Sequence, residues 1–73
     1  MTPEQCKMAR AGLGVNVRKL GEMAGISYTT VTRYENNGNA QILTINKMRM
    51  ALEAAGVEFI PENGGGVGVR LKK

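Results

Sequence analysis

The sequence predicts a mainly helical domain of four short helices, followed by a C-terminal β-hairpin or a pair of extended arms. Three observations carry this prediction. Residues that favour helix N-termini alternate along the chain with glycines that favour helix ends. Apolar residues between these signals recur at spacings of three and four. After residue 56 the apolar residues alternate with polar or small ones, which is typical of strands.

The size and charge of the chain limit what it can do. Its 73 residues make one small domain, and a hydrophobic fraction of 42% is enough to build a core. Ten lysines and arginines against six acidic residues give a net charge of +4. This basic excess favours an anionic partner, with nucleic acid before a membrane surface.

The residue types that are rare or missing exclude several classes of function. The chain has one cysteine and no histidine, so an intrachain disulfide, a zinc finger and Ser–His or Cys–His catalysis are all excluded. We expect no enzyme activity, no metal and no cofactor, and we expect Cys6 to be a buried apolar residue. No apolar run is long enough to span a membrane and no signal peptide is visible, so the expected location is the cytoplasm.

The first helix is predicted over residues 3–12. Thr2 is placed to cap it, Pro3 suits its first position, and Gln5 completes a capping box. Gly12 and Gly14 are expected to end it. One side of this helix carries Cys6, Ala9, Arg10 and Leu13.

Two short helices follow, predicted over residues 17–24 and 28–36. Asn16 and Ser27 are their N-caps, and Gly25 and Gly38 end them. Ile26 is expected to be buried in the turn between them. Gly21 lies inside the first of the two helices, where a glycine costs ~1 kcal/mol relative to alanine. We therefore expect the two helices to approach too closely at Gly21 for any larger side chain.

The fourth helix is predicted over residues 45–55, with Thr44 as its N-cap and Gly56 at its end. Its core-facing stripe is expected to contain Ile45, Met48, Leu52 and Ala55.

The last segment, residues 57–73, is predicted to form the hairpin or arms. Its alternating apolar positions are split by the glycine-rich stretch P-E-N-G-G-G, which contains Asn63. That stretch lacks the Lys-Ser/Thr pair of a phosphate-binding loop. The end of the chain is basic, with Arg70, Lys72 and Lys73, which could follow a DNA backbone or be a solvated tail.

The third helix is predicted to have two different sides. A rotation of 100° per residue with Val31 at the centre of the buried side brings Tyr34, Glu35 and Tyr28 close to it. The opposite side then carries Thr29, Thr32, Arg33 and Asn36. Threonine and arginine suit the major groove of DNA, because they can contact thymine methyls and the acceptors of guanine. The alternative is an ordinary solvated helix face.

Residues 16–38 contain the patterns L-x-x-x-A-G-I-S and V-x-x-Y-E-x-x-G. With these motifs the sequence resembles the phage repressor/Cro-like helix-turn-helix family, the XRE-type regulators. The resemblance covers residues 2–56, with the helix-turn-helix at 17–36. It implies a compact lambda-repressor-like domain that binds double-stranded operator DNA, usually as a homodimer.

The resemblance also implies roles for individual residues. Arg10 and Glu35 occupy the places of a structural salt bridge. The family often has a phosphate-contacting glutamine where this chain has Val17, so contacts at that end must come from other groups. The implied base contacts are Tyr28, Thr29, Thr32 and Arg33, and the backbone contacts are Asn16, Arg18, Lys19, Ser27 and Asn36.

The function we expect is therefore sequence-specific DNA binding by a transcriptional regulator. The alternative is a protein-interaction module, such as an antitoxin subunit that binds a partner protein. No small-molecule substrate is evident. The hairpin is the expected dimer contact, because exposed strand edges and the apolar Val57 and Phe59 would favour pairing.

Overall fold

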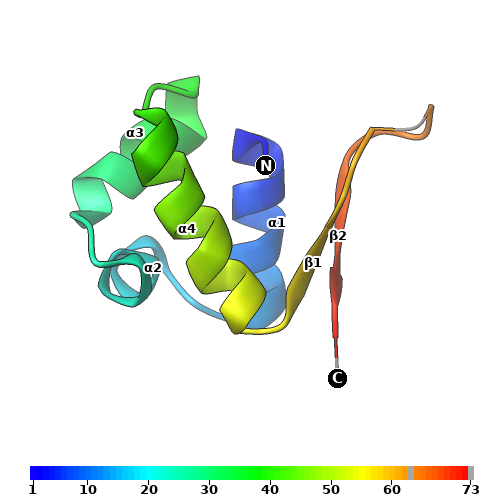
Figure 1. Ribbon diagram of the computed structural model, residues 1–73, viewed down its shortest axis with the longest axis horizontal. Coiled ribbons are helices and arrows are strands. Elements are labelled where there is room, and N and C mark those ends of the chain that lie inside the picture. Colours follow the sequence, from blue (N-terminus) through cyan, green and yellow to red (C-terminus); the bar gives the residue numbers. More distant parts are fainter. Residues whose placement is uncertain (63, 73) are drawn as a thin grey trace.

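The computed structural model describes residues 1–62 and 64–72, so Asn63 and Lys73 lie outside the described residues. The protein is mainly helical with one small antiparallel sheet, as predicted. Figure 1 shows α2 and α3 on one side of the molecule and the hairpin on the other, with α1 and α4 between them. The elements are α1 (Pro3–Leu13), α2 (Val17–Ala24), α3 (Tyr28–Asn37), α4 (Ile42–Ala54), β1 (Val57–Ile60) and β2 (Gly68–Leu71).

The N-terminal caps of the first three helices are those that the sequence predicted. The capping box of α1 is complete, since Thr2 Oγ1 accepts from the Gln5 amide at 3.1 Å and Gln5 Oε1 accepts from the Thr2 amide at 2.9 Å. Asn16 caps α2 and Ser27 caps α3. Gly12 does not end α1, because Gly14 takes the left-handed conformation that terminates the helix, with φ of 72°.

The predicted start of α4 is wrong. Thr44 is not its N-cap, because the helix already begins at Ile42, and Gln41 takes the N-cap position without a capping hydrogen bond from its side chain. The Ile45 amide donates to the Gln41 carbonyl at 2.9 Å, which closes the first turn. No glycine or proline interrupts residues 42–44, and leucine favours helix more than threonine does, so the helix extends by one turn.

The core is continuous between the helices and β1. Ala55 does not join the predicted stripe of α4, because it lies beyond the last helical residue and is exposed. Val57 on β1, only 2% exposed, extends the core instead. Ile26 in the α2–α3 turn is half-buried and packs against the core. The core consists of Cys6, Ala9, Leu20, Val31, Tyr34, Met48, Leu52 and Val57.

The C-terminal segment is a hairpin that belongs to the same core. Its strands pair antiparallel, with Phe59 opposite Val69. Phe59, Val69 and Leu71 pack against the helical core, so the apolar side chains expected to attract a partner face inward. Gln5 joins α1 to the hairpin, since its Nε2 donates to the Ile60 carbonyl at 2.9 Å and to the Gly68 carbonyl at 3.0 Å. None of the helices in the described residues has the length and apolar character needed to cross a bilayer.

Candidate nucleic-acid interface

Helix α3 has a buried side and an exposed side, as the sequence predicted, but Tyr28, which was expected close to the buried side, is 39% exposed. Val31 is completely buried, and Tyr34 and Glu35 are 3% and 6% exposed. The opposite side carries exposed side chains from four of the predicted site residues, Thr29, Thr32, Arg33 and Asn36. This exposed side is the candidate interface, and the contacts below explain how it is held in place.

Gly21 fixes the approach of α2 to the start of α3. A Cβ atom added at Gly21 would lie 2.9 Å from the Ile26 carbonyl oxygen and 3.1 Å from the Tyr28 amide nitrogen. Both of these atoms belong to the backbone, so a side chain could not be accommodated by a rotamer change. The predicted close approach is confirmed. The turn is closed by the Ile26 amide, which donates to the Gly21 carbonyl at 2.9 Å.

Arg10 and Glu35 anchor the other end of α3 to α1. Arg10 Nε donates to Glu35 Oε2 at 2.6 Å and Nη2 donates to Oε1 at 2.7 Å, which is a bidentate ion pair. A further Arg10 nitrogen donates to the Val15 carbonyl at 3.3 Å. The Glu35 side chain is only 5% exposed, so this pair holds three segments together and does not belong to the exposed surface.

The pKa values of Arg10 and of the neighbouring Cys6 are both raised in the folded protein. The hydrogen bonds to Glu35 raise the pKa of Arg10 above its ordinary value. Cys6 is fully buried and donates its thiol proton to Glu35 Oε2 at 3.2 Å. Burial, followed by the hydrogen bond to Glu35, raises the pKa of Cys6 to about 12. The thiol is therefore protonated at neutral pH and is not a nucleophile.

Tyr34 ties α3 to the N-terminus of the chain. Its hydroxyl donates to the Met1 carbonyl oxygen at 2.8 Å. Burial raises the pKa of Tyr34 above its ordinary value. The two buried polar side chains of α3, Tyr34 and Glu35, thus both have partners elsewhere in the fold, which leaves this helix little freedom to rotate.

The polar side chains near the start of α3 make local hydrogen bonds. Ser27 Oγ accepts from the Thr29 amide at 3.2 Å and lies 2.7 Å from Thr29 Oγ1. Thr32 Oγ1 donates to the Tyr28 carbonyl at 3.2 Å. The Asn16 side-chain oxygen accepts from the Lys19 amide at 2.8 Å. These bonds engage Ser27 Oγ twice and each of the other side chains once, and Thr29 and Thr32 remain exposed to an external ligand.

Arg18 and Tyr28 form a contact that sequence reasoning missed. The Arg18 guanidinium carbon lies 4.2 Å from the centroid of the Tyr28 ring, and Arg18 Nη2 lies 3.4 Å from the Tyr28 hydroxyl. A cation above an aromatic ring is attracted to its electron-rich face. Both residues were predicted as separate DNA contacts, and no local spacing could have shown that α2 and α3 bring them together.

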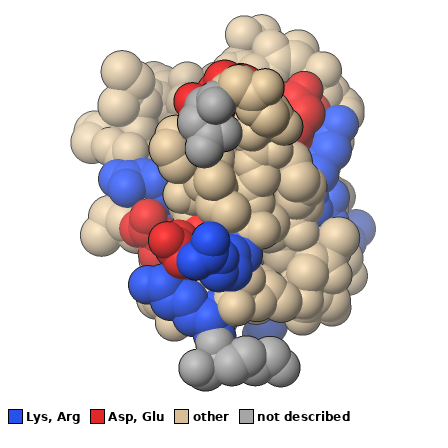
Figure 2. Space-filling view, turned by 90° about the vertical axis from the view of Figure 1, so that its right-hand side faces the viewer, with Lys and Arg blue, Asp and Glu red and all other residues tan. Residues whose placement is uncertain are grey.

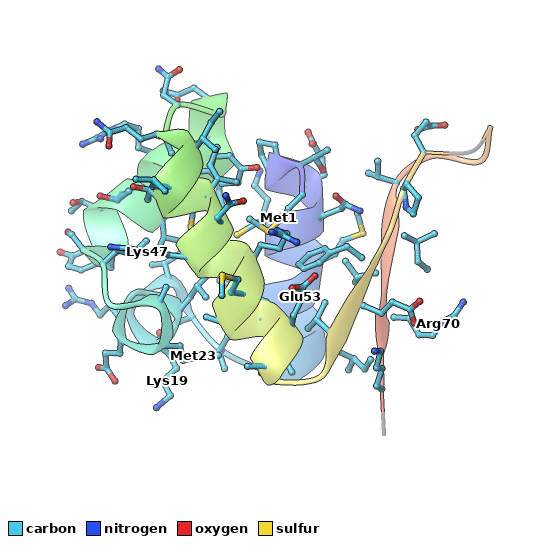
Figure 3. All side chains as sticks on the ribbon, in the orientation of Figure 1. Met1, Lys19, Met23, Lys47, Glu53 and Arg70 are labelled. Carbon is cyan, nitrogen blue, oxygen red and sulfur yellow. The ribbon has the colours of Figure 1, made fainter. Side chains whose placement is uncertain are left out.

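The two sides of the molecule differ in how many of their cations form ion pairs. Arg18, Arg33 and Lys47 make no ion pair with any residue that the structure describes. Figure 3 shows Lys47 on the α2–α3 side of α4 and Lys19 at the outer edge of α2. The exposed Lys19 side chain is 3.9 Å from Glu22. Lys47 was not predicted as a site residue, because its place on α4 alone gave no indication of its distance from α3.

On the hairpin side, positive and negative side chains lie next to each other (Figure 2). Arg70 pairs with Glu58 across the two strands at 3.4 Å, and Arg49 pairs with Glu53 along α4 at 3.5 Å. Arg70 is therefore partly neutralised, whereas Lys72 is exposed and has no ion pair among the described residues. The α2–α3 side carries three cations without such a pair, Arg18, Arg33 and Lys47, and α3 itself presents no exposed acidic residue.

The candidate interface is an open surface. Across residues 1–62 and 64–72 there is no pocket and no cluster of three metal-ligating side chains. No protein-family model matches the chain, and neither does any curated protein.

Proposed function

We propose that this chain is a sequence-specific DNA-binding transcriptional regulator of the lambda-repressor-like helix-turn-helix type, and that it acts as a homodimer. Helix α3 is the recognition helix and enters the major groove, whose width of about 12 Å admits a helix. The observation that carries the proposal is the composition of the outward side of α3. This side is exposed, polar and free of acidic residues, while the inward side of the same helix is fixed to α1 and α2.

The residue types on α3 fit readout of bases. Arg33 can donate two hydrogen bonds to guanine O6 and N7, and the methyl groups of Thr29 and Thr32, both exposed residues, can contact thymine. The helix dipole places partial positive charge at the start of α3, which favours a nearby phosphate. Arg18 and Tyr28 are already oriented by each other, so less side-chain freedom is lost when they bind.

The side chains proposed to contact the DNA backbone come from the ends of α2 and α3 and from α4. Asn16 retains its side-chain amide donors after capping α2, and Lys19, Asn36 and Lys47 are exposed. Ser27 contributes mainly by capping α3, since its hydroxyl is already engaged there. These groups position the domain on the duplex but read no sequence.

The test is selection of bound duplexes from a random DNA pool, followed by titration of the selected duplex at several salt concentrations. We expect one enriched sequence, and an affinity that falls by ~0.9 log units per tenfold rise in salt for each phosphate contacted. Absence of enrichment together with no binding at low salt would refute the proposal and favour the protein-interaction module.

A matched pair of variants separates a specific surface from general positive charge. Lys47→Gln and Arg70→Gln remove the same charge from opposite sides of the molecule. We expect Lys47→Gln to weaken binding to all duplexes and to lower the salt slope by about one phosphate contact. Arg70→Gln should leave the salt slope unchanged. Equal effects of the two variants would contradict the assigned face.

A further inference from the structure

The side chain of Arg18 starts on α2, but its guanidinium lies against the first residue of α3. Arg18 Cζ is 4.2 Å from the centroid of the Tyr28 ring, and Arg18 Nη2 donates to the Tyr28 hydroxyl oxygen at 3.4 Å. Tyr28 directly follows the Ser27 cap, and both Arg18 and Tyr28 are exposed. The charged end of Arg18 is therefore held at the N-terminal end of α3, where a ligand can reach it.

The guanidinium of Arg18 keeps most of its hydrogen-bonding capacity for a ligand. Arg18 forms no ion pair with any residue that the structure describes, whereas the neighbouring Lys19 lies 3.9 Å from Glu22. Within the described part of the chain, the Tyr28 hydroxyl is the one acceptor for the Arg18 side chain. A guanidinium has several further N–H donors in a rigid fork. These donors are held in place by the ring and remain unengaged.

The position of this group decides which part of a duplex it meets. When a helix-turn-helix docks on DNA, the N-terminal residues of the recognition helix contact base edges, while the preceding helix crosses the backbone. As a residue of α2, Arg18 was predicted to contact the backbone. The contact with Tyr28 places its guanidinium instead at the end of α3 that meets the bases. Lys19 has no such contact with α3 in the structure, so it keeps the backbone role.

A held guanidinium suits a base better than a phosphate. Phosphates recur along the whole backbone, so a freely moving lysine finds one without a fixed orientation. A guanine presents O6 and N7 at one place and in one plane, and arginine donates to both at once. Arginine loses much side-chain freedom on binding, and a ring that restricts the side chain beforehand reduces that loss.

We propose that Arg18 is a specificity-determining residue that reads one guanine in the major groove, and that Tyr28 is the positioning residue that holds it there. This inference rests on the proposed function. It gives the interface a second guanine-reading residue, on α2, beside Arg33 on α3. The preference for the second guanine depends on the contact between two helices and not on α3 alone.

The first experiment repeats the selection from a random duplex pool with Arg18→Ala and with Lys19→Ala. The parent should enrich guanine at one position where Arg18→Ala shows no preference, and affinity for the parent's duplex should fall roughly 5- to 150-fold in that variant. A duplex with that guanine replaced should be bound equally by the parent and by Arg18→Ala. Lys19→Ala is the matched control from the same helix, and it should weaken binding to all duplexes alike.

A modified base tests the atoms that are read. In 7-deazaguanine a C–H group replaces N7, which removes one acceptor from the major groove and leaves Watson–Crick pairing intact. The parent should bind the duplex with 7-deazaguanine at that position more weakly than the unmodified duplex. Arg18→Ala should bind the two duplexes equally. An equal loss in the parent and in Arg18→Ala would overturn the inference.

Substitutions of Tyr28 test its role as a positioning residue. Tyr28→Leu removes the ring and should abolish the preference for the guanine that Arg18 reads, while the preference that depends on Arg33 remains. Tyr28→Phe restores the ring and should retain the preference. The double variant Arg18→Ala/Tyr28→Leu should discriminate at that base pair no less than Arg18→Ala does. Additive losses of discrimination would overturn the positioning role, because independent residues give additive effects.

Nuclear magnetic resonance tests the contact without DNA. The ring current of Tyr28 should shift the Arg18 side-chain protons upfield in the parent and in Tyr28→Phe, and the shift should vanish in Tyr28→Leu. Thermal unfolding should be alike in the three proteins, since Tyr28 is exposed. Absence of the upfield shift in the parent would overturn the inference.

The outcomes separate the inference from the function on which it rests. If Arg18→Ala behaves as Lys19→Ala does, weakening all duplexes alike and lowering the salt slope, Arg18 contacts the backbone and the inference fails while DNA binding stands. If the parent itself enriches no sequence and binds no duplex at low salt, the proposed function fails.

Discussion

The inward and outward sides of α3 use polar residues for opposite purposes. On the inward side, Glu35 accepts from Arg10 and Cys6, and the Tyr34 hydroxyl donates to the Met1 carbonyl. On the outward side, the one hydrogen bond of Thr32 is to the backbone of its own helix. The inward polar groups therefore join distant parts of the chain, while the hydrogen bond of the outward Thr32 stays within its own helix and joins no other element.

This difference predicts which substitutions should affect folding stability and which should affect binding. Changes on the inward side, or beneath it, should alter the free energy of unfolding whatever ligand is present. Changes on the outward side should leave unfolding unaffected and alter only binding. Four predictions test that division, in order of decreasing effect.

The largest effect is expected from Gly21→Leu, beneath the start of α3. A side chain there would overlap the backbone at Ile26 and Tyr28, so the protein should fail to fold or melt far below the parent. Thermal unfolding followed by circular dichroism measures this. Gly12→Ala is the control, because its Cβ would meet only the Leu71 side chain at 3.4 Å, and it should melt at the parent's temperature or above it. A parent-like melt of Gly21→Leu would contradict the close approach.

The next largest effect is expected from Arg10→Met, which leaves the buried Glu35 carboxylate without its partner. Loss of one member of a buried ion pair should lower the free energy of unfolding by ~3–5 kcal/mol. Urea denaturation measures it. Arg49→Met breaks the exposed pair with Glu53 and should change the free energy of unfolding by less than about 1 kcal/mol. Similar losses of unfolding free energy in the two variants would show that burial of Glu35 does not strengthen its ion pair.

Arg33→Ala tests the outward side. The free energy of unfolding should stay within ~0.5 kcal/mol of the parent, because Arg33 is exposed and has no ion pair among the described residues. Affinity for the selected duplex should fall by ~1–3 kcal/mol, with preference relaxed at one base pair. Arg70→Ala removes an arginine from the other side and should keep that preference. Loss of stability in Arg33→Ala would undermine the division between the two sides.

The smallest effect is a pH dependence from Cys6. Its pKa is raised in the folded state from 9.0 to about 12, so the folded protein holds this proton more tightly than the unfolded chain does. The resulting stability is fully present below pH 9 and is lost as the pH rises toward 12. Between pH 8 and pH 10 the free energy of unfolding should fall by about 1 kcal/mol from this group.

Urea denaturation of the parent and of Cys6→Ala at pH 8, 9 and 10 checks the pH dependence. The variant should lose less stability than the parent over this interval. Tyr34, whose pKa is raised from 10.0, adds a loss of the same sign only at higher pH. Equal losses in the parent and in Cys6→Ala would show that the thiol is not responsible.

Local signals predicted most of the fold. The caps at Thr2, Asn16 and Ser27 fixed the starts of three helices, because a side-chain oxygen two or three residues before an unpaired amide is a local arrangement. The start of α4 was mispredicted because Thr44 has the chemistry of a cap, and no nearby residue shows that the helix has already begun.

Much of the candidate site was also predictable. The two sides of α3 follow from helical periodicity around Val31, and the Arg10–Glu35 pair followed from the family resemblance. The contact of Arg18 with Tyr28 and that of Gln5 with the hairpin were not predictable, because each joins elements whose relative placement no local pattern encodes.

The sequence by itself determined where three helices begin, which side of α3 is buried, and that Gly21 must be a glycine, since caps, periodicity and backbone crowding act over a few residues. Only the tertiary structure decided that the apolar side of the hairpin closes the core and that Ile42 and Leu43 remain exposed. The physical reason is that burial depends on which surfaces meet, and the hairpin returns to α1 across more than fifty residues of chain, which brings Gln5 and Gly68 within hydrogen-bonding distance.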